Sequence, residues 1–199
     1  MAGADQPLAT PAAISFQGWC LALALSLGAA VSLGITRFAY GLLLPAMRTD
    51  LGWSYTLAGA MNTANALGYL IGALWAPRLL RTRGPGEVLW RGAVLASVFM
   101  GLSGFFTDTT ALLAQRLLAG VASALVFVAG GLLAARLGAR FPRHHGLLLG
   151  MYYGGTGVGI VLSALMVPWL LEAFAAQPHG WQWSWWALAL ACAVGTAVL

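Results

Sequence analysis

The sequence predicts an all-α polytopic membrane protein, a transmembrane bundle of six helices. The first observation is composition: 60% of the 199 residues are hydrophobic and only 8% are charged, whereas soluble domains carry about 25% charged residues. The second is six long apolar runs, most of which reach the ~20 residues that cross ~30 Å of hydrocarbon. Each run must be helical in lipid, because its backbone has to satisfy its own hydrogen bonds.

The apolar runs are the elements of this bundle, and short polar connections join consecutive runs. In chain order they span residues 19–44, 56–76, 88–106, 111–135, 146–171 and 181–199. Together they form one predicted domain, residues 18–199, after a tail at 1–17 that contains no basic residue. Because the first run is also longer than the core of a signal peptide, we expect no cleaved signal.

The charged residues of the connections alternate between the two sides of the predicted bundle. Seven arginines fall on one side, in the connections after the second and fourth runs: Arg78, Arg81, Arg83, Arg91, Arg136, Arg140 and Arg143. Among the connections of the other side there is only Arg48. The positive-inside rule therefore places the arginine-rich side and the N-terminus in the cytoplasm. These arginines act as topology signals at a lipid bilayer, so we expect no nucleic-acid partner.

Two arginines lie well inside the apolar runs, Arg37 in the first and Arg116 in the fourth, whereas Arg91 lies at the start of the third. A guanidinium near the bilayer centre costs ~2.5–3.5 kcal/mol on insertion scales, so it normally faces a cavity or a partner charge. For Arg37 the alternative is that the side chain reaches toward the interface. No carboxylate lies deep in any run. The arginines therefore favour an anionic solute, such as a carboxylate or phosphate ester, which a planar guanidinium binds through two hydrogen bonds.

Polar side chains at helical spacing complete a predicted substrate-binding set. Tyr40 shares a helical face with Arg37, and Asn62, Asn65 and Tyr69 form a stripe on the second helix. The predicted set is Arg37, Tyr40, Asn62, Asn65, Arg116 and Tyr153. For the two asparagines, hydrogen bonding between helices is an equally good interpretation.

Pairs of glycines four residues apart predict closely packed helix faces. They are Gly68 with Gly72, Gly150 with Gly154, and Gly155 with Gly159.

An enzyme is a remote alternative. The stretch Gly101-Leu-Ser-Gly104 matches the nucleophile motif of rhomboid-type intramembrane serine proteases. Such a serine needs a base within reach, and the only histidine on the same side is His179. His144-His145 has no third metal ligand nearby. We therefore expect no enzyme, no metal and no cofactor.

Three ordered motifs resemble the N-terminal six-helix half of a major facilitator superfamily (MFS) transporter. They are Pro45-x-x-Arg-x-Asp-Leu-Gly52, Gln115-Arg-x-x-x-Gly120 and Gly180-Trp-x-Trp183. The stretch GITRFAYGLLLPAMRTDLG, followed by NTAN, is more narrowly similar to the bacterial YbfB/YjiJ-like branch. One departure is Ala76, which stands where the family has an acidic residue.

The resemblance implies two three-helix repeats, half of an MFS fold, in a cell inner membrane. It also implies secondary active transport of a small solute by alternating access. The second six-helix half would be either a C-terminal half beyond this sequence or a second copy of the chain. The alternative is a half-size membrane subunit, or a relic, that does not transport.

Overall fold

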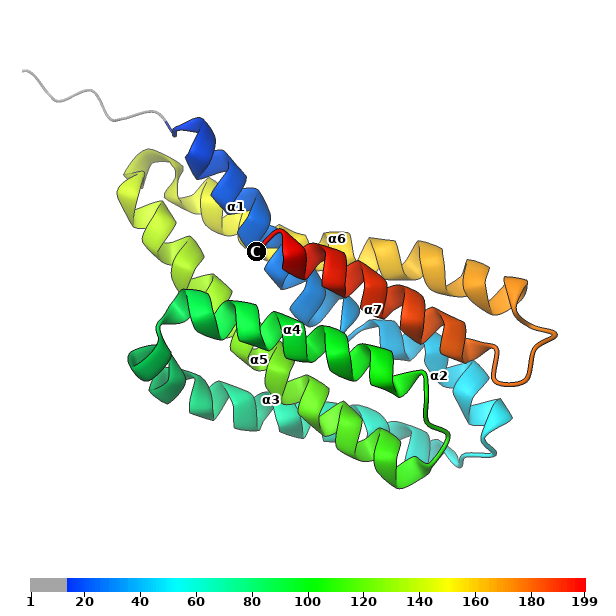
Figure 1. Cartoon of the computed structure of the whole chain (residues 1–199). Coiled ribbons are helices and arrows are strands. Elements are labelled where there is room, and N and C mark those ends of the chain that lie inside the picture. Colours follow the sequence, from blue (N-terminus) through cyan, green and yellow to red (C-terminus); the bar gives the residue numbers. More distant parts are fainter. Residues whose placement is uncertain (1–13) are drawn as a thin grey trace, which may run out of the picture.

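The computed structural model describes residues 14–199, and within them every element is a helix (Figure 1). The first membrane-crossing unit consists of α1 (Phe16–Ala29), the π-helix η1 (Ala30–Ile35) and α2 (Ala39–Asp50). The other helices are α3 (Tyr55–Arg83), α4 (Pro85–Ser103), α5 (Thr109–Arg140), the 3₁₀-helix η2 (Pro142–His144), α6 (His145–Ala173) and α7 (Trp181–Ala197). Most of the tail expected at 1–17 lies outside the described residues.

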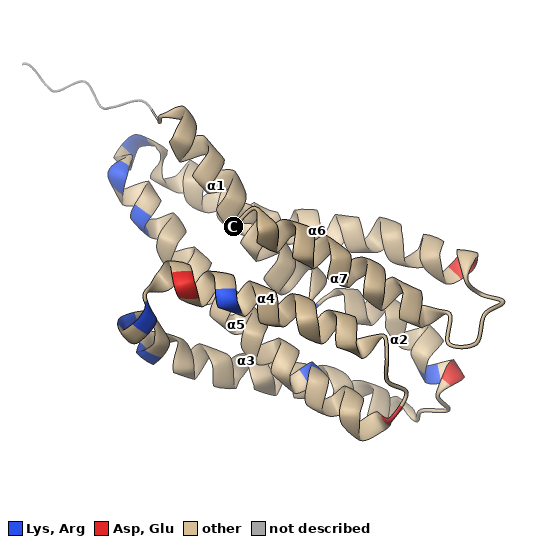
Figure 2. Cartoon of the chain, viewed as in Figure 1, with Lys and Arg blue, Asp and Glu red and all other residues tan. Residues whose placement is uncertain are grey.

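Three stretches of this bundle are long and apolar enough to cross a membrane by length and composition. They are Phe16–Asp50, Thr109–Arg140 and Pro142–Ala173. The other three helices, α3, α4 and α7, run alongside them (Figure 1). Charged residues gather toward the two ends of the bundle, and few lie between (Figure 2).

Side-chain caps define where the long helices begin. Ser54 accepts a hydrogen bond from the Leu57 amide at 3.2 Å, and Asp108 accepts one from the Ala111 amide at 2.8 Å. Such caps satisfy amide groups that have no partner within the helix. Between α3 and α4 the chain turns at Gly84, whose φ of 81° favours glycine.

The first membrane crossing is one span, Phe16–Asp50, with a break in its α-helical pattern at 30–38 that the apolar run predicted at 19–44 does not show. Through η1 the backbone is π-helical, and the amides of Thr36 and Phe38 donate to carbonyls five residues back, at 3.1 and 3.3 Å. The chain then turns before α2 begins at Ala39. A π-helical segment inserts extra backbone into a helix and is frequent at functional sites. No proline occurs here, so periodicity alone does not reveal the break.

Glycines bring α3 against α5. A Cβ at Gly68 would collide with the carbonyl oxygen of Leu117, and one at Gly72 would approach that of Val121. Without a hydrophobic effect between helices in lipid, small residues allow the close approach on which packing depends. This contact confirms the close packing predicted for the Gly68 pair.

The same unit recurs between α6 and the first crossing. A Cβ at Gly155 would collide with the carbonyl oxygen of Ser26, and one at Gly159 would approach that of Ala30. Gly155 and Gly159 follow Gly68 and Gly72 by 87 residues. The carbonyl groups that they face, those of Ser26 and Ala30, precede those of Leu117 and Val121 by 91 residues. The bundle therefore contains two related units, as expected of two three-helix repeats.

The two three-helix repeats meet at a pair of equivalent serines. Ser123 on α5 stands 91 residues after Ser32 in η1, and its hydroxyl donates to the Ser32 carbonyl at 2.6 Å. Both side chains are fully buried. Because equivalent positions touch each other only near a two-fold axis, the pseudo-symmetry axis passes beside this contact.

Candidate functional site

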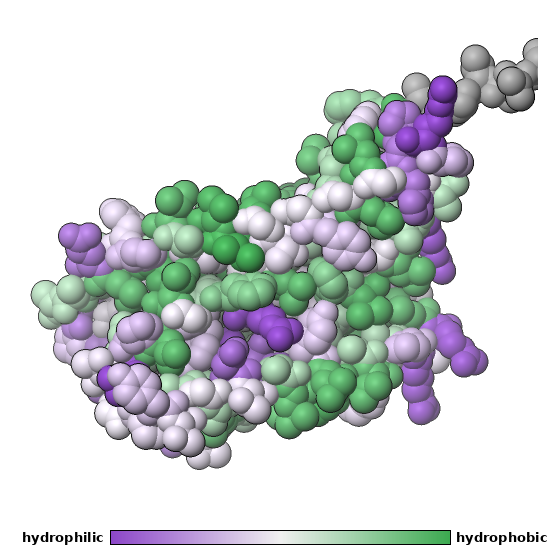
Figure 3. All heavy atoms as spheres, turned by 180° about the vertical axis from the view of Figure 1, so that it is seen from behind, coloured by the Kyte–Doolittle hydropathy of each residue, from purple (hydrophilic) through white to green (hydrophobic). Residues whose placement is uncertain are grey.

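A cavity of about 440 Å³ opens beside the break in the first crossing. It lies between that crossing and α3, and its lining residues are Leu33, Arg37, Phe38, Tyr40, Gly41, Leu44, Ala58, Gly59 and Asn62. Seen from behind, the bundle shows a hydrophilic patch partway along a mostly hydrophobic surface (Figure 3). None of the residues lining the cavity is a carboxylate.

Arg37 is the charged residue of the cavity lining. It lies in the turn between η1 and α2 and is partly exposed. Its guanidinium carbon sits 5.2 Å from the ring centroid of Tyr69 on α3, within the range of a cation–π interaction. The break therefore places a cation inside the bundle while leaving it accessible from the cavity.

Arg116 lies behind the cavity wall. It is only 2% exposed, and its Nη1 donates to the Thr36 carbonyl at 3.2 Å, in the turn that follows η1. Its guanidinium lies 4.7 Å from the ring of Tyr40 and 5.8 Å from that of Trp185. Within residues 14–199, its Nε and Nη2 have no hydrogen-bond partner. Arg116 thus supports the interrupted helix from behind.

Tyr40 separates the two arginines. Its ring lines the cavity and stacks near Arg116, while its hydroxyl donates to the Ala58 carbonyl at 2.9 Å. That hydrogen bond ties α2 to α3 across the base of the cavity. Tyr40 is therefore both part of the lining and a brace between two helices.

The two asparagines of α3 occupy different environments. Asn62 is exposed and lines the cavity. Asn65 is 1% exposed, and its Nδ2 donates to the Arg116 carbonyl at 3.0 Å. Of the two interpretations left open by the sequence, the structure places Asn65 in an interhelical hydrogen bond and Asn62 at the cavity.

Tyr153 lies apart from the cavity lining. It is 52% exposed on α6, and its ring centroid lies 5.1 Å from that of Tyr152 and 5.8 Å from that of Phe127. Tyr69 was not included in the predicted set, although it contacts Arg37. The signal for Tyr69 was its place on the Asn62 and Asn65 stripe. The six-residue binding set stays a prediction, of which Arg37, Tyr40 and Asn62 meet at one cavity.

Two tryptophans at the start of α7 face the interior of the bundle. Trp181 and Trp185 are 3% and 1% exposed and pack in the core. The Trp181 indole donates to the carboxylate of Asp50 at the end of α2, which also pairs with His179. The Asp50 carboxylate thus links the start of α7 to the end of α2.

The serine of the protease-like motif forms a hydrogen bond within its own helix. Ser103 is 2% exposed, and its hydroxyl donates to the Phe99 carbonyl at 2.8 Å. His179 pairs with Asp50 instead. Over the described part of the chain, no group of three His, Cys, Asp or Glu residues could hold a metal ion.

Comparisons with known proteins agree with this architecture. The structure is similar to that of the MFS proton:xylose symporter XylE bound to 6-bromo-6-deoxy-D-glucose, with a TM-score of 0.73 at 15% identity. That match covers 93% of this chain and 44% of XylE, so the chain spans less than half the length of that transporter. No curated protein sequence matches the chain.

A family model identifies the chain directly. The model described as "Uncharacterised MFS-type transporter YbfB" matches residues 29–199, which include both intramembrane arginines and the whole cavity lining. Family and fold point to a membrane transporter and not to an enzyme. The chain belongs to the YbfB-like family of MFS transporters.

Proposed function

We propose that this chain is one half of a secondary transporter that carries a small anionic solute by alternating access. The observation that carries the proposal is Arg37, a cation in a cavity lined by no carboxylate. A buried or half-buried charge is costly in a membrane, and it is retained where a substrate or partner balances it. A carboxylate or phosphate ester would supply that balance through two parallel hydrogen bonds.

The dimensions and polarity of the cavity support a small solute. Its volume of about 440 Å³ falls in the range of ordinary small-molecule sites, roughly 300–1,000 Å³. Asn62 supplies an amide that can donate or accept a hydrogen bond, and the remaining lining is mostly apolar. A solute with one anionic group and a less polar remainder matches this lining.

Alternating access requires a second half. In transporters built from repeats, the solute binds near mid-membrane between the two halves, which rock around it. The match to 44% of XylE supports a partner of similar size. We propose that a second six-helix half, either C-terminal to this one or a second copy, closes the open side of the cavity.

We also propose that the protein lies in the cell inner membrane with its N-terminus, residues 1–17, in the cytoplasm. The arginines between α3 and α4 and between α5 and α6 support this orientation through the positive-inside rule.

Transport by Arg37 variants tests the substrate class. In the full-length transporter, uptake of a panel of carboxylates and phosphate monoesters would be compared with uptake of xylose. We expect Arg37→Gln to raise the KM for the transported anion by roughly 10- to 150-fold, since hydrogen bonds to a charged group are worth about 1.5–3 kcal/mol. Arg37→Lys should recover part of the loss, because it keeps the charge without the planar fork.

Arg48→Gln is the matched control, because Arg48 stacks on Tyr55 at 4.1 Å and is absent from the cavity lining. It should leave KM unchanged. Uptake of anions by Arg37→Gln at the wild-type KM would refute the anionic assignment. Uptake of uncharged sugars alone would replace it with a sugar transporter.

A further inference from the structure

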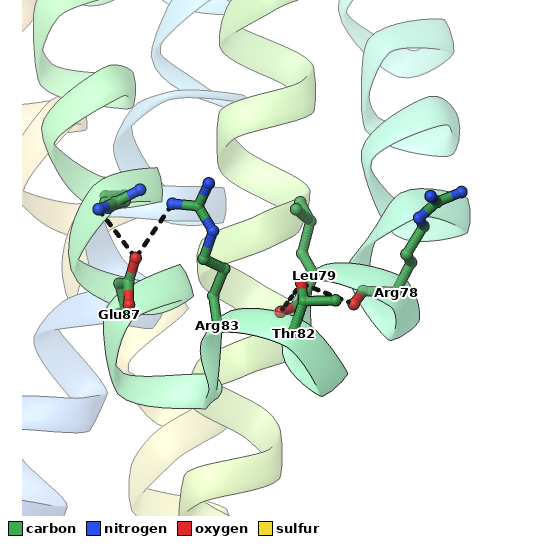
Figure 4. Close-up of polar contacts among 6 residues, drawn as sticks. Arg78, Leu79, Thr82, Arg83 and Glu87 are labelled. Atoms are coloured by element: carbon green, nitrogen blue, oxygen red, sulfur yellow. Dashed lines mark hydrogen bonds and ion pairs between the residues drawn. The ribbon is translucent and has the colours of Figure 1, made fainter.

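The arginine-rich end of the bundle contains two kinds of arginine. Arg83 and Arg91 both pair with Glu87, at 3.2 and 2.9 Å. Within residues 14–199, Arg78 and Arg81 have no ion pair. Figure 4 shows Arg83 beside Glu87, whereas Arg78 lies on the far side of Thr82. Arg83 and Arg91 thus share one carboxylate, whereas Arg78 and Arg81 have no carboxylate partner within residues 14–199.

The unpaired arginines border a hollow at the C-terminal end of α3. The hollow has a volume of about 610 Å³ and is lined by Leu74, Pro77, Arg78, Arg81 and Thr82. A second hollow of about 290 Å³ shares Arg78 and is lined also by Trp75 and Leu79. Arg78 and Arg81 thus line one hollow, and none of its lining residues is a carboxylate.

The hydrogen-bonding character of this hollow favours an acceptor-rich group. Thr82 donates its hydroxyl to the backbone carbonyls of Arg78 and Leu79, at 3.1 and 3.3 Å (Figure 4). Its proton is therefore already used, and the free donors are the two guanidiniums. Guanidiniums bind phosphate oxygens with paired hydrogen bonds.

An apolar stripe leads along α3 to the same place. Leu67, Leu70 and Leu74 are 49%, 55% and 71% exposed, and their spacing puts them on one face of the helix. Trp75 is 61% exposed beside them, as is typical of the membrane–water interface. The surface therefore changes from apolar to cationic along one helix face, as an acidic phospholipid changes from acyl chain to phosphate.

We propose that Arg78 and Arg81 bind the phosphate of an acidic phospholipid, whose acyl chain lies along the leucine stripe. Basic pockets at the ends of transmembrane helices are suited to such headgroups. A free phosphate would use the arginines but not the stripe, so the apolar surface favours the lipid. This site is separate from the cavity at Arg37 and does not depend on the solute carried.

Native mass spectrometry of the full-length protein tests the site. Purified protein would be titrated with phosphatidylglycerol and with phosphatidylcholine of the same acyl chains. We expect Arg78→Gln/Arg81→Gln to weaken phosphatidylglycerol binding about 30-fold, because each surface guanidinium contributes a factor of roughly five toward anionic lipid. Binding of phosphatidylcholine should not change.

Arg83→Gln/Arg91→Gln is the matched control, since it removes the same number of charges from the same end of the bundle. It should weaken phosphatidylglycerol binding less than about threefold, because neither Arg83 nor Arg91 lines the hollow at Arg78 and Arg81. Equal losses in the two double variants would mean diffuse charge attraction and would overturn the site. Displacement of the lipid by millimolar inorganic phosphate would show a free-anion site instead. Equal binding of both lipids by the wild type would also overturn the proposal.

Discussion

At the scale of single residues, the structure separates side chains that the sequence grouped together. Arg37 and Arg116 both lie in apolar runs. Arg37 lines a cavity, whereas Arg116 is buried against the ring of Tyr40. The difference arises from the turn at 36–38, which carries Arg37 on its cavity side and offers a carbonyl to Arg116 on its buried side. Membership of an apolar run therefore does not say whether an arginine lines a cavity or is buried.

The asparagine pair gives a residue-scale prediction. Asn65→Ala removes the interhelical hydrogen bond to the Arg116 carbonyl, and we expect a loss of about 0.6 kcal/mol in stability, up to ~1.7, with little change in KM. Asn62→Ala should raise KM and leave stability unchanged, because Asn62 is exposed at the cavity. Thermal unfolding in detergent and uptake kinetics measure both. The reverse pattern would place Asn65, and not Asn62, at the solute.

At the scale of elements, helix packing depends on which glycines meet a neighbouring backbone. The pairs at Gly68 and Gly155 each face a carbonyl, whereas a methyl group added at Gly150 or Gly154 would meet nothing within 4 Å in residues 14–199. Of the three glycine pairs that the sequence predicts as packing faces, the Gly150 pair therefore makes no close contact within the described chain. Its side of α6 faces outward, because the Gly155 stripe is the side turned toward α1.

Glycine substitutions test this assignment. We expect Gly68→Ala and Gly155→Ala each to destabilise the bundle by about 1–3 kcal/mol, since the added methyl group would push two backbones apart. Gly154→Ala is the control and should leave the unfolding temperature unchanged. Unfolding followed by circular dichroism or by thiol labelling of the buried Cys192 provides the measurement. A control as damaging as Gly68→Ala would contradict the packing described here.

The interrupted first crossing gives a second prediction at this scale. Arg116 on α5 donates to the Thr36 carbonyl, so it ties α5 to the turn between η1 and α2. We expect Arg116→Gln to lower the maximal transport rate while changing KM less than about twofold, because the side chain is sealed from the cavity. Arg116→Lys should restore part of the rate. An increase in KM as large as that of Arg37→Gln would instead identify Arg116 as a direct contact of the solute.

At the scale of the whole molecule, the two ends of the bundle differ in charge. Arginines of the α3–α4 and α5–α6 connections share one end, and Asp50, Asp108 and Glu172 belong to connections at the other. Such an asymmetry sets orientation during membrane insertion. The same arginine-rich end carries the proposed lipid site.

Reporter fusions in the full-length protein test this orientation. Alkaline phosphatase, which is active only outside the cytoplasm, should be active when fused after Phe106 and inactive when fused after Arg143. Green fluorescent protein, which folds in the cytoplasm, should give the opposite pattern at the same positions. Phosphatase activity after Arg143 would mean that the arginine-rich end faces outward and that the N-terminus is not cytoplasmic.

The sequence by itself determined the class of the protein and the order of its helices. Hydropathy and backbone hydrogen bonding leave only helices in lipid, so runs such as 111–135 predicted α5 (Thr109–Arg140) closely. The family followed from ordered motifs, and the family model confirmed it over residues 29–199.

Only the tertiary structure decided where the first crossing breaks and which polar residues face the cavity. The break at 30–38 contains no proline, and packing against α6 and the hydrogen bond from Arg116 accompany it. Likewise Asn62 and Asn65 are alike in sequence, but α5 covers one and leaves the other open. The environment of each of these residues depends on neighbours that are distant in the chain, so local periodicity does not predict it.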